Sequence, residues 1–363
     1  MWITLKEMEI MNRNIVFTEP GKVELIDCPM PEVRTGEVLV RIVRTCLSSG
    51  TERANLLGVP DNGVSIFSNA PDGQVTWPRQ GGYSSSGVVE SVGDGVTSLK
   101  VGDRVAMCWT VHADYVSVPE HRVFHIPEGV SFEAAAFANI ATFPLAAIRK
   151  CRLELGESAI VMGQGVLGQL AVKLLKVGGA MPVVAADPDV DKRKRAIELG
   201  ADYAFDPMLP DFAEAVKSVC DCGGYRLEGR VRDAGAKVAI EVTGRGVALD
   251  QVLDAVAPFA RVALLGCTRD SDFTINYYRK VHGRGITLVG AHTAARPDNE
   301  SSPGWWSTRD DAFAYLKLVA GKRLNMDGFV SGTYTPDKAP SVYAKLAKGG
   351  AFPVVQFDWI AEA

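Results

Sequence analysis

The sequence predicts an α/β fold in two parts, an all-β unit of barrel or sandwich type followed by a doubly wound parallel sheet. Three observations support this prediction. The chain has 363 residues, more than one hydrophobic core usually accommodates. Its first third consists of short runs of alternating apolar and polar residues, which are typical of strands. The rest alternates continuous apolar runs with helical patterns, as in a parallel sheet that is covered on both faces.

The all-β unit is expected from Ile15 to about Pro127. Its short runs are rich in β-branched residues and are separated by glycine, proline and aspartate, which favour turns. The segment from 53 to 80 is long and rich in proline, glycine and asparagine, and such loops in compact domains are more often functional than idle. The expected strands are residues 22–28, 36–45, 86–93, 103–107, 113–118 and 124–129.

The second unit is expected to begin near Ser131. Residues 131–150 have helical apolar spacing behind Ser131 as the N-cap, with Glu133 in the first turn. Apolar runs then predict parallel strands, with helices between most of them. Near the end of the chain, a helix over 339–349 precedes a strand over 353–359 that could return to the first unit. The expected parallel strands are residues 158–163, 182–187, 238–244, 261–266 and 285–290.

Composition and charge exclude several classes of function. The net charge is −4 and the basic residues form no stripe, so we expect no nucleic-acid partner. No apolar run approaches the roughly 20 residues of a membrane span, and the N-terminus lacks the apolar segment of a signal peptide. We therefore expect a cytoplasmic protein without a membrane partner, whose first ten residues form a loose extension before Met11.

The cysteines do not indicate a disulfide framework. They are seven in number and scattered along the chain, as expected for reduced thiols in the cytoplasm. Cys220 and Cys222 are the closest pair. We interpret them as thiols at a helix end, with a redox or metal element as the alternative.

A glycine-rich turn lies between an expected strand and an expected helix. Gly163, Gly165 and Gly168 have the GxGxxG spacing that lets the backbone approach a pyrophosphate at a helix N-terminus. Asp187 ends the next strand, where a carboxylate accepts hydrogen bonds from the ribose diol of NAD and repels the 2′-phosphate of NADP. The sequence thus predicts NAD. Val166, Leu167, Thr243 and Gly266 complete the expected cofactor-binding residues.

Two alternatives to NAD binding remain open at this turn. The turn could be a glycine-tolerant connection, with Asp187 as an ordinary helix cap. Residues 192–195 have the sequence KRKR and are interpreted as the solvated start of a helix. One of these cations could instead reach a 2′-phosphate, which would favour NADP.

A series of motifs runs in order from GEVLVR and SSGTE through GGYSSSGVVESVGDGVTSLKVGDRV to FANIAT and GQGVLG. This order resembles the medium-chain dehydrogenase/reductase superfamily, the zinc-type alcohol and polyol dehydrogenases, over about residues 14–359. VESVGDGVTSLKVGDRV is a specific match to the VxxVGxxVxxxxxGDRV run of that family. The resemblance implies a GroES-like β-barrel catalytic domain over 11–130 and 325–363, a Rossmann domain over 131–324, and a homodimer.

The resemblance also implies where the zinc ligands of the family would stand. Ser49 falls on a cysteine, Tyr83 on a histidine, Ser84 on the adjacent glutamate, and Asn139 on the ligand from the later helix. Hydroxyl and amide groups are poor ligands for a tetrahedral zinc site. The lobe for structural zinc is also missing, because residues 105–118 contain one cysteine where the lobe needs four. We therefore expect neither metal site.

Without a metal, another group must polarise the substrate oxygen and exchange its proton. Tyr83, the phenol nearest the lost metal, is the first candidate, and its alternative role is aromatic packing over a loop. Ser49, Thr51 and Asn139 could bind the same oxygen. The run of three serines after Tyr83 is otherwise expected to be a small-residue strand that lets a helix or the cofactor approach.

Two histidines are possible proton relays, because imidazole titrates in the useful range. They are His112 and His292; the alternatives are a surface loop for His112 and a core or interface position for His292. The resemblance implies that Glu52 is structural and pairs with an arginine, either Arg53 or one distant in sequence.

The expected substrate contacts are aromatic. Trp305 and Trp306 lie in a polar segment after an expected strand, and Tyr277 and Tyr278 precede that strand. Such side chains suit a sugar ring, a flat conjugated ligand or a subunit interface. The resemblance implies an interface role for at least one of the tryptophans.

Three functions are consistent with these residues. The first is a metal-independent, NAD(H)-dependent oxidoreductase acting on a secondary alcohol or ketone, such as a sugar or polyol derivative. The second is a zinc-free enoyl or quinone reductase, in which the acceptor is already polarised. The third is a non-catalytic protein that binds NAD. The many hydroxyl groups favour the first.

Overall fold

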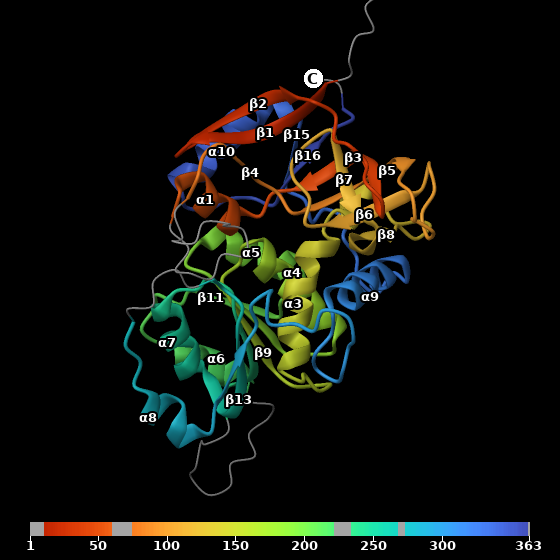
Figure 1. The fold of residues 1–363 in the computed structure, drawn as a ribbon. Coiled ribbons are helices and arrows are strands. Elements are labelled where there is room, and N and C mark those ends of the chain that lie inside the picture. Colours follow the sequence, from red (N-terminus) through yellow and green to blue (C-terminus); the bar gives the residue numbers. More distant parts are fainter. Residues whose placement is uncertain (1–10, 60–74, 221–233, 268–272, 362–363) are drawn as a thin grey trace, which may run out of the picture.

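The strands gather into three sheets in the computed structural model, which describes residues 11–59, 75–220, 234–267 and 273–361. A three-stranded sheet and a seven-stranded sheet form the first unit, and a six-stranded parallel sheet forms the second. The predicted α/β class, an N-terminal β unit beside a doubly wound parallel sheet, is confirmed. In Figure 1 the β unit lies at the top and the parallel sheet with its helices lies below it.

The seven-stranded sheet is built around β3 (Glu37–Cys46), whose burial alternates as its sequence predicts. β3 pairs antiparallel with β5 and β7, and β5 continues the sheet through β6 to β8. A smaller sheet of β2, β1 and β4 completes the unit. These strands are β1 (Asn12–Glu19), β2 (Lys22–Cys28), β4 (Arg79–Gln80), β5 (Ser84–Val92), β6 (Arg104–Cys108), β7 (Tyr115–Pro119) and β8 (Val123–His125).

The end of the chain returns to the first unit. β15 (Gly332–Tyr334) pairs parallel with β16 (Val355–Asp358), and β16 pairs antiparallel with β3. Figure 1 shows these blue strands beside the red and orange N-terminal ones. Between them, α10 (Ala339–Lys348) packs against β2 and against α1 (Ser49–Leu57), the helix that borders the cleft described below.

The sequence predicts one continuous helical pattern over residues 131–150, whereas the structure has two helices there. Ser131 accepts a hydrogen bond from Ala134 N at 3.1 Å, as expected of an N-cap. The segment forms two helices, α2 (Phe132–Ala135) and α3 (Ala138–Lys150). The break lets the carbonyls of Phe132 and Ala136 accept hydrogen bonds from serine hydroxyls of β5, so a tertiary contact overrides continuous helix here.

The parallel sheet has the strand order β11-β10-β9-β12-β13-β14. Both faces of this sheet are covered, so alternate residues of a strand pack into different hydrophobic cores. In β9, Val161 belongs to the core on one face and Ile160 to the core on the other. The strands are β9 (Ala159–Met162), β10 (Val183–Ala186), β11 (Tyr203–Phe205), β12 (Ala236–Glu241), β13 (Val256–Leu264) and β14 (Thr287–Gly290).

Helices cover both faces of this sheet. α3, α4 and α9 pack together on one face, and α6 and α7 pack on the other. In Figure 1, α3 and α4 also lie just below the β unit, where the two units meet. The remaining helices are α4 (Val166–Val177), α5 (Val190–Glu198), α6 (Phe212–Cys220), α7 (Gly246–Ala255), α8 (Tyr277–Lys280) and α9 (Thr308–Ala320).

Among the described residues, no helix has both the length and the apolar character that a membrane crossing requires. Six cysteines lie in the described ranges, and no disulfide joins any two of them. Cys220 ends α6, whereas Cys222 lies outside the described residues, so the expectation for that pair stays a prediction.

Candidate active site

A cleft of about 560 Å³ lies between the two units. One wall is α1 with the residues before and after it. The other wall is formed by segments at the carboxyl ends of the parallel strands β9, β10, β12 and β13, the edge at which open α/β sheets bind ligands. The described lining residues with polar or charged side chains are Ser48, Ser49, Thr51, Arg53, Gln164, Asp187, Lys192, Thr243 and Cys267.

The glycine-rich turn connects β9 to α4 and lines the cleft. Gly163 has φ +96°, a conformation that favours glycine, and a Cβ on Gly168 would lie 1.8 Å from the carbonyl oxygen of Gly163. Gly165 is the N-cap of α4, and no side chain caps this helix. The first N–H groups of α4 are therefore available to an anion at this turn, so the residues fit a pyrophosphate.

The residues predicted to bind the cofactor meet in this cleft, with one exception. Gly168 is not part of the lining, and its role is the close packing of α4 on the turn. Those that line the cleft are Gly163, Gly165, Val166, Leu167, Asp187, Thr243 and Gly266.

Asp187 lies at the end of β10 and is nearly buried. Its two oxygens accept hydrogen bonds from Gln164 N at 2.8 Å and from Asp189 N at 2.9 Å. These bonds fix the carboxylate at the edge of the cleft, where it would meet the ribose diol. Lys192 Nζ lies 3.8 Å from the same carboxylate, and of residues 192–195 it alone lines the cleft.

Glu241 is a residue of this edge that the sequence analysis missed. It ends β12 and accepts hydrogen bonds from the backbone N–H groups of Thr243 and Gly244. Burial raises the pKa of Glu241, and the hydrogen bonds offset part of that rise. The carboxylate thus fixes the turn that places Thr243 in the cleft. Its position at the end of an apolar strand, in EVTG, is the signal that could have indicated it.

Tyr83 directly precedes β5, and 5% of its surface is exposed. Burial raises the pKa of its phenol well above the ordinary value, and hydrogen bonds with the side chains of Ser48 and Thr51 offset part of the rise. Both partners line the cleft. The ring of Tyr83 packs against those of Trp109 and Phe143, with centroids 5.9 and 5.7 Å away.

The three serines after Tyr83 fasten β5 to its neighbours. Ser84 Oγ donates to the carbonyl of Ala136 at 2.5 Å, and Ser86 Oγ donates to that of Phe132 at 2.7 Å. Ser85 shares a hydrogen bond of 2.7 Å with Thr110. The expectation of a small-residue strand that lets a helix approach is confirmed, because α2 and the start of α3 lie against these hydroxyls.

At the positions where the resemblance expects zinc ligands, the side chains are hydroxyl and amide groups, which do not fit a tetrahedral zinc site. Asn139 Nδ2 donates to the carbonyl of Tyr83 at 2.7 Å, and Ser84 is engaged with the backbone. Ser49 is a neutral hydroxyl that lines the cleft. Over the ranges that the structure describes, no group of three or more histidine, cysteine, aspartate or glutamate side chains could hold a metal ion.

His112 lies inside the β unit rather than on a surface loop, and it is fully buried. Its Nδ1 shares a hydrogen bond of 2.7 Å with Thr45, and its Nε2 lies 3.0 Å from Glu52 Oε2. Neither ring nitrogen is left for a substrate, so the geometry does not support the predicted proton relay. The arginine partner expected for Glu52 is also wrong, since His112 and Tyr343 bind its carboxylate.

His292 follows β14 and does not line the cleft. Its Nδ1 accepts a hydrogen bond from Ala294 N at 3.1 Å, which leaves it in a local turn. The geometry thus gives no support to the predicted relay at this position either.

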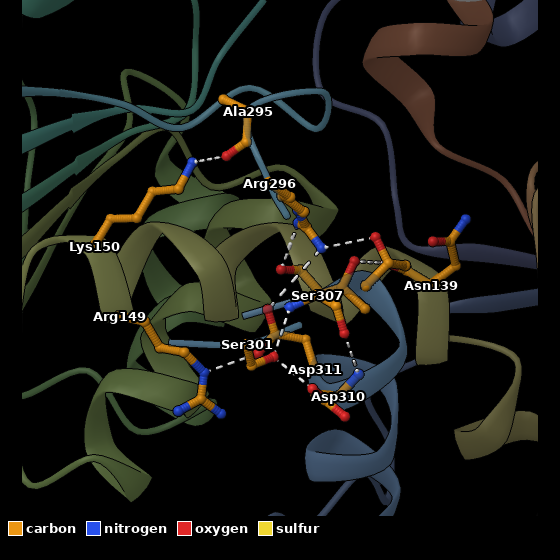
Figure 2. A network of polar contacts seen from close by, with 11 residues as sticks. Asn139, Arg149, Lys150, Ala295, Arg296, Ser301, Ser307, Asp310 and Asp311 are labelled. Carbon is orange, nitrogen blue, oxygen red and sulfur yellow. Dashed lines mark hydrogen bonds and ion pairs between the residues drawn. The ribbon is translucent and has the colours of Figure 1, made fainter. Parts of the chain in front are cut away.

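Arg149 and Lys150, two cations of α3, contact the segment after β14. Trp306 stacks on the guanidinium of Arg149 at 3.5 Å, and Trp305 lies 4.7 Å from Lys150 Nζ. Figure 2 shows that Arg149 also binds Asp311, and that Lys150 binds the carbonyl of Ala295. Both tryptophans therefore already have packing partners within the chain.

Two family models match this chain, one in each unit. The model described as "Alcohol dehydrogenase GroES-like domain" matches residues 34–128, and "Zinc-binding dehydrogenase" matches residues 166–303. L-threonine 3-dehydrogenase of Pyrococcus horikoshii is 24% identical, covering 94% of this chain and 97% of the relative. (R,R)-butanediol dehydrogenase of Bacillus subtilis is 28% identical, covering 69% of this chain and 72% of the relative.

A solved structure from Sinorhizobium meliloti 1021, named as a zinc-binding dehydrogenase bound to NADP, has a TM-score of 0.76 at 21% identity. It covers 96% of this chain and 99% of its own. At this identity the likeness shows a shared fold.

Proposed function

Because this chain belongs to the medium-chain dehydrogenase/reductase superfamily of zinc-type alcohol dehydrogenases, and is thus an NAD(P)-dependent dehydrogenase, we propose that it is a metal-independent member. Its substrate is a secondary alcohol or ketone, such as a sugar or polyol derivative. The observation that carries the proposal is the cluster of Tyr83, Ser48 and Thr51. Its hydroxyls are hydrogen-bonded to one another beside the cleft, and Tyr83 is at a position where the resemblance expects a zinc ligand.

The cleft supports a nicotinamide dinucleotide as the cofactor. The uncapped start of α4 fits a pyrophosphate, and Asp187 fits the hydroxyls of an unphosphorylated ribose. When bound, the nicotinamide supplies or accepts the hydride. We propose NAD, with NADP as the alternative, because the cation Lys192 lines the cleft and lies 3.8 Å from the Asp187 carboxylate.

Tyr83 is proposed to bind and polarise the substrate oxygen. Its pKa is raised by burial, so the phenol keeps its proton through the neutral range and can donate a hydrogen bond to a carbonyl. Ser48 and Thr51, which contact the phenol, can pass a proton between it and the open cleft. A protonated donor of this kind suits reduction of a ketone better than abstraction of a proton from an alcohol.

Independence from metal rests on the donor set. A tetrahedral zinc site uses thiolate, imidazole or carboxylate ligands. This chain offers a serine, a phenol and an amide at those positions, and the amide nitrogen is already bound to a carbonyl. The phenol would therefore replace zinc as the group that polarises the oxygen.

The substrate class is supported by the relatives and by the polar lining. L-threonine and (R,R)-butanediol, for which the relatives are named, are small secondary alcohols with a second polar group. The cleft of this chain carries hydroxyls on Ser48, Ser49 and Thr51 that suit such a compound.

A zinc-free enoyl or quinone reductase is the second candidate, and one observation favours it. Tyr83, Trp109 and Phe143 form a cluster of three rings with centroids 5.7–6.1 Å apart, next to the cleft-lining Ser48 and Thr51. An aromatic cluster beside the cleft would suit a flat conjugated acceptor.

The test combines binding and turnover on one purified sample. NADH and NADPH are titrated by fluorescence, metal content is measured, and polyols, ketosugars, small ketones, enones and quinones are screened. Turnover of ketones without bound zinc is expected, with NADH bound more tightly than NADPH. Turnover of enones or quinones alone supports the second candidate, and cofactor binding without any turnover supports a non-catalytic NAD-binding protein.

We also propose that the protein is a homodimer. β14 ends the parallel sheet, and in the part of the chain that the structure describes its outer edge pairs with no strand. Light scattering on the purified protein tests this, with twice the chain mass expected and a monomer mass against it.

A further inference from the structure

The described lining of the cleft contains three charged side chains: Arg53, Asp187 and Lys192. Lys192 and Asp187 lie 3.8 Å apart at the end of β10 and balance each other. Arg53 comes from α1, on the opposite wall. No carboxylate of the described residues lies within ion-pairing distance of it, because neighbouring Glu52 turns inward to His112.

Arg53 is held in place but is not satisfied. One guanidinium nitrogen donates to the carbonyl of Ala347, near the end of α10, at 3.2 Å. A Cβ on Gly349 would lie 3.2 Å from the same nitrogen, and Gly349 has φ +75°, so a glycine here lets the guanidinium sit against the end of α10. The Nε of Arg53 is buried and has no partner. A buried N–H without an acceptor is costly and indicates a missing partner.

The opposite wall presents the glycine turn and the uncapped start of α4. A helix N-terminus supplies only about half a positive charge, whereas a pyrophosphate carries about two negative charges. Arg53 is the one described cation of the cleft that has no acidic partner to share its charge. A guanidinium also offers several donors in a planar fork, which suits phosphate oxygens.

We infer that Arg53 binds the pyrophosphate of the cofactor from the side of the β unit, opposite the glycine turn. The inference rests on the proposed use of a nicotinamide dinucleotide, but on no particular substrate. Arg53 and the glycine turn belong to different units, so a shared ligand joins them, and cofactor binding favours the arrangement in which the two walls approach.

The test is calorimetric titration of the full-length protein with ADP-ribose, which carries the pyrophosphate without nicotinamide. Arg53→Gln is expected to weaken ADP-ribose and NADH by about tenfold to a hundredfold, as loss of a hydrogen bond to a charged group implies. Adenosine, which lacks phosphate, should bind both proteins alike. Inorganic pyrophosphate should compete with NADH in the native protein and much less in the variant.

Arg323→Gln is the matched control, because it removes one exposed arginine that does not line the cleft. Arg53→Lys keeps the charge without the planar fork and should bind ADP-ribose with intermediate affinity. This second variant also keeps the test valid if Arg53→Gln does not fold, which circular dichroism shows.

ADP-ribose affinities within twofold of the native protein for both Arg53 variants would overturn the inference, and so would equal weakening by Arg323→Gln. If the native protein binds neither NADH, NADPH nor ADP-ribose, the proposed cofactor fails and the inference fails with it. If ADP-ribose binding depends on Arg53 but no substrate turns over, the inference stands and the proposed activity fails.

Discussion

The interior face of α1 and its cleft face differ in how completely their polar groups are paired. Inside the β unit, Glu52 is bound by His112 and Tyr343, and all three side chains are buried. On the cleft face, Thr51 lines open space and Arg53 keeps an unpaired Nε. Glu52 of α1 thus belongs to a buried hydrogen-bond network, whereas the adjacent Thr51 and Arg53 line the cleft.

This difference separates stability from function. A buried network in which each group has a partner holds the fold and offers nothing to a ligand. Groups that remain accessible or unpaired at the cleft are available to cofactor and substrate. Substitutions in the interior network should therefore change the free energy of unfolding, and substitutions at the cleft should change binding or turnover.

The largest expected effect is for Tyr83→Phe, which changes the partner of the cleft-lining Ser48 and Thr51. Loss of the hydroxyl removes the proposed hydrogen-bond donor, so kcat/KM for ketone reduction should fall by about 10²- to 10⁴-fold. The NADH Kd and the unfolding midpoint should change little, because the ring remains. Steady-state kinetics and thermal melting measure both. Tyr334→Phe is the control, and a Tyr83→Phe enzyme with native turnover would break the assignment.

The interior network should give the next largest effect, on stability. His112→Ala leaves the Glu52 carboxylate buried without its imidazole partner, which typically costs about 3–5 kcal/mol. Urea unfolding measures this, and the NADH Kd of the folded protein should stay within twofold. His292→Ala, in a local turn, should change stability by less than about 0.5 kcal/mol. Lost turnover with unchanged stability in His112→Ala would restore the relay hypothesis.

Asp187→Ala should change which cofactor the cleft prefers. Removing the carboxylate leaves Lys192 without its neighbour and takes away a charge that repels a 2′-phosphate. The ratio of the NADPH Kd to the NADH Kd should fall by about tenfold or more. Fluorescence titration gives both constants. A ratio that does not move would mean that Asp187 only caps the turn.

Substitution of Glu241 shows whether the turn beside the cleft contributes to stability, as the interior network does. Its pKa is raised by burial, so the stability linked to its protonated form is fully present below about pH 4.5 and is lost as pH rises through the folded pKa. Glu241→Gln stays neutral, so its stability relative to the native protein should increase over that pH range. Urea unfolding at several pH values checks this, and a constant difference would contradict it.

Trp305→Ala should have the smallest effect. The ring lies over Lys150 and is 44% exposed, so its loss should cost about 0.5–1 kcal/mol of stability. KM for a sugar or polyol should be unchanged. A KM that rises several-fold would show that the tryptophan binds substrate after all.

Local sequence patterns predicted most of the fold and one half of the site. The order of strands and helices follows from hydrophobic period, and the glycine turn with Asp187 follows from spacing and position at a strand end. These are local features. The break between α2 and α3 depends on hydroxyls of β5 that are distant in sequence, so the helical pattern alone could not show it.

The rest of the site depends on which residues meet through the fold. Glu52 was expected to pair with an arginine, and it meets His112 and Tyr343, which lie 60 and 291 positions away. Likewise, the two tryptophans after β14 were expected to contact a ligand or a second subunit, and in the structure their rings pack on Arg149 and Lys150 of α3. No local signal distinguishes a partnered side chain from a free one.

The most direct test of the central claim measures zinc content and ketone reduction on the same sample, before and after dialysis against a chelator. The claim is that Tyr83 and its hydroxyl partners replace zinc. The account predicts zinc far below one ion per chain, with NADH-dependent turnover that the chelator does not change. About one zinc per chain, with turnover lost on chelation and restored by zinc, would contradict it.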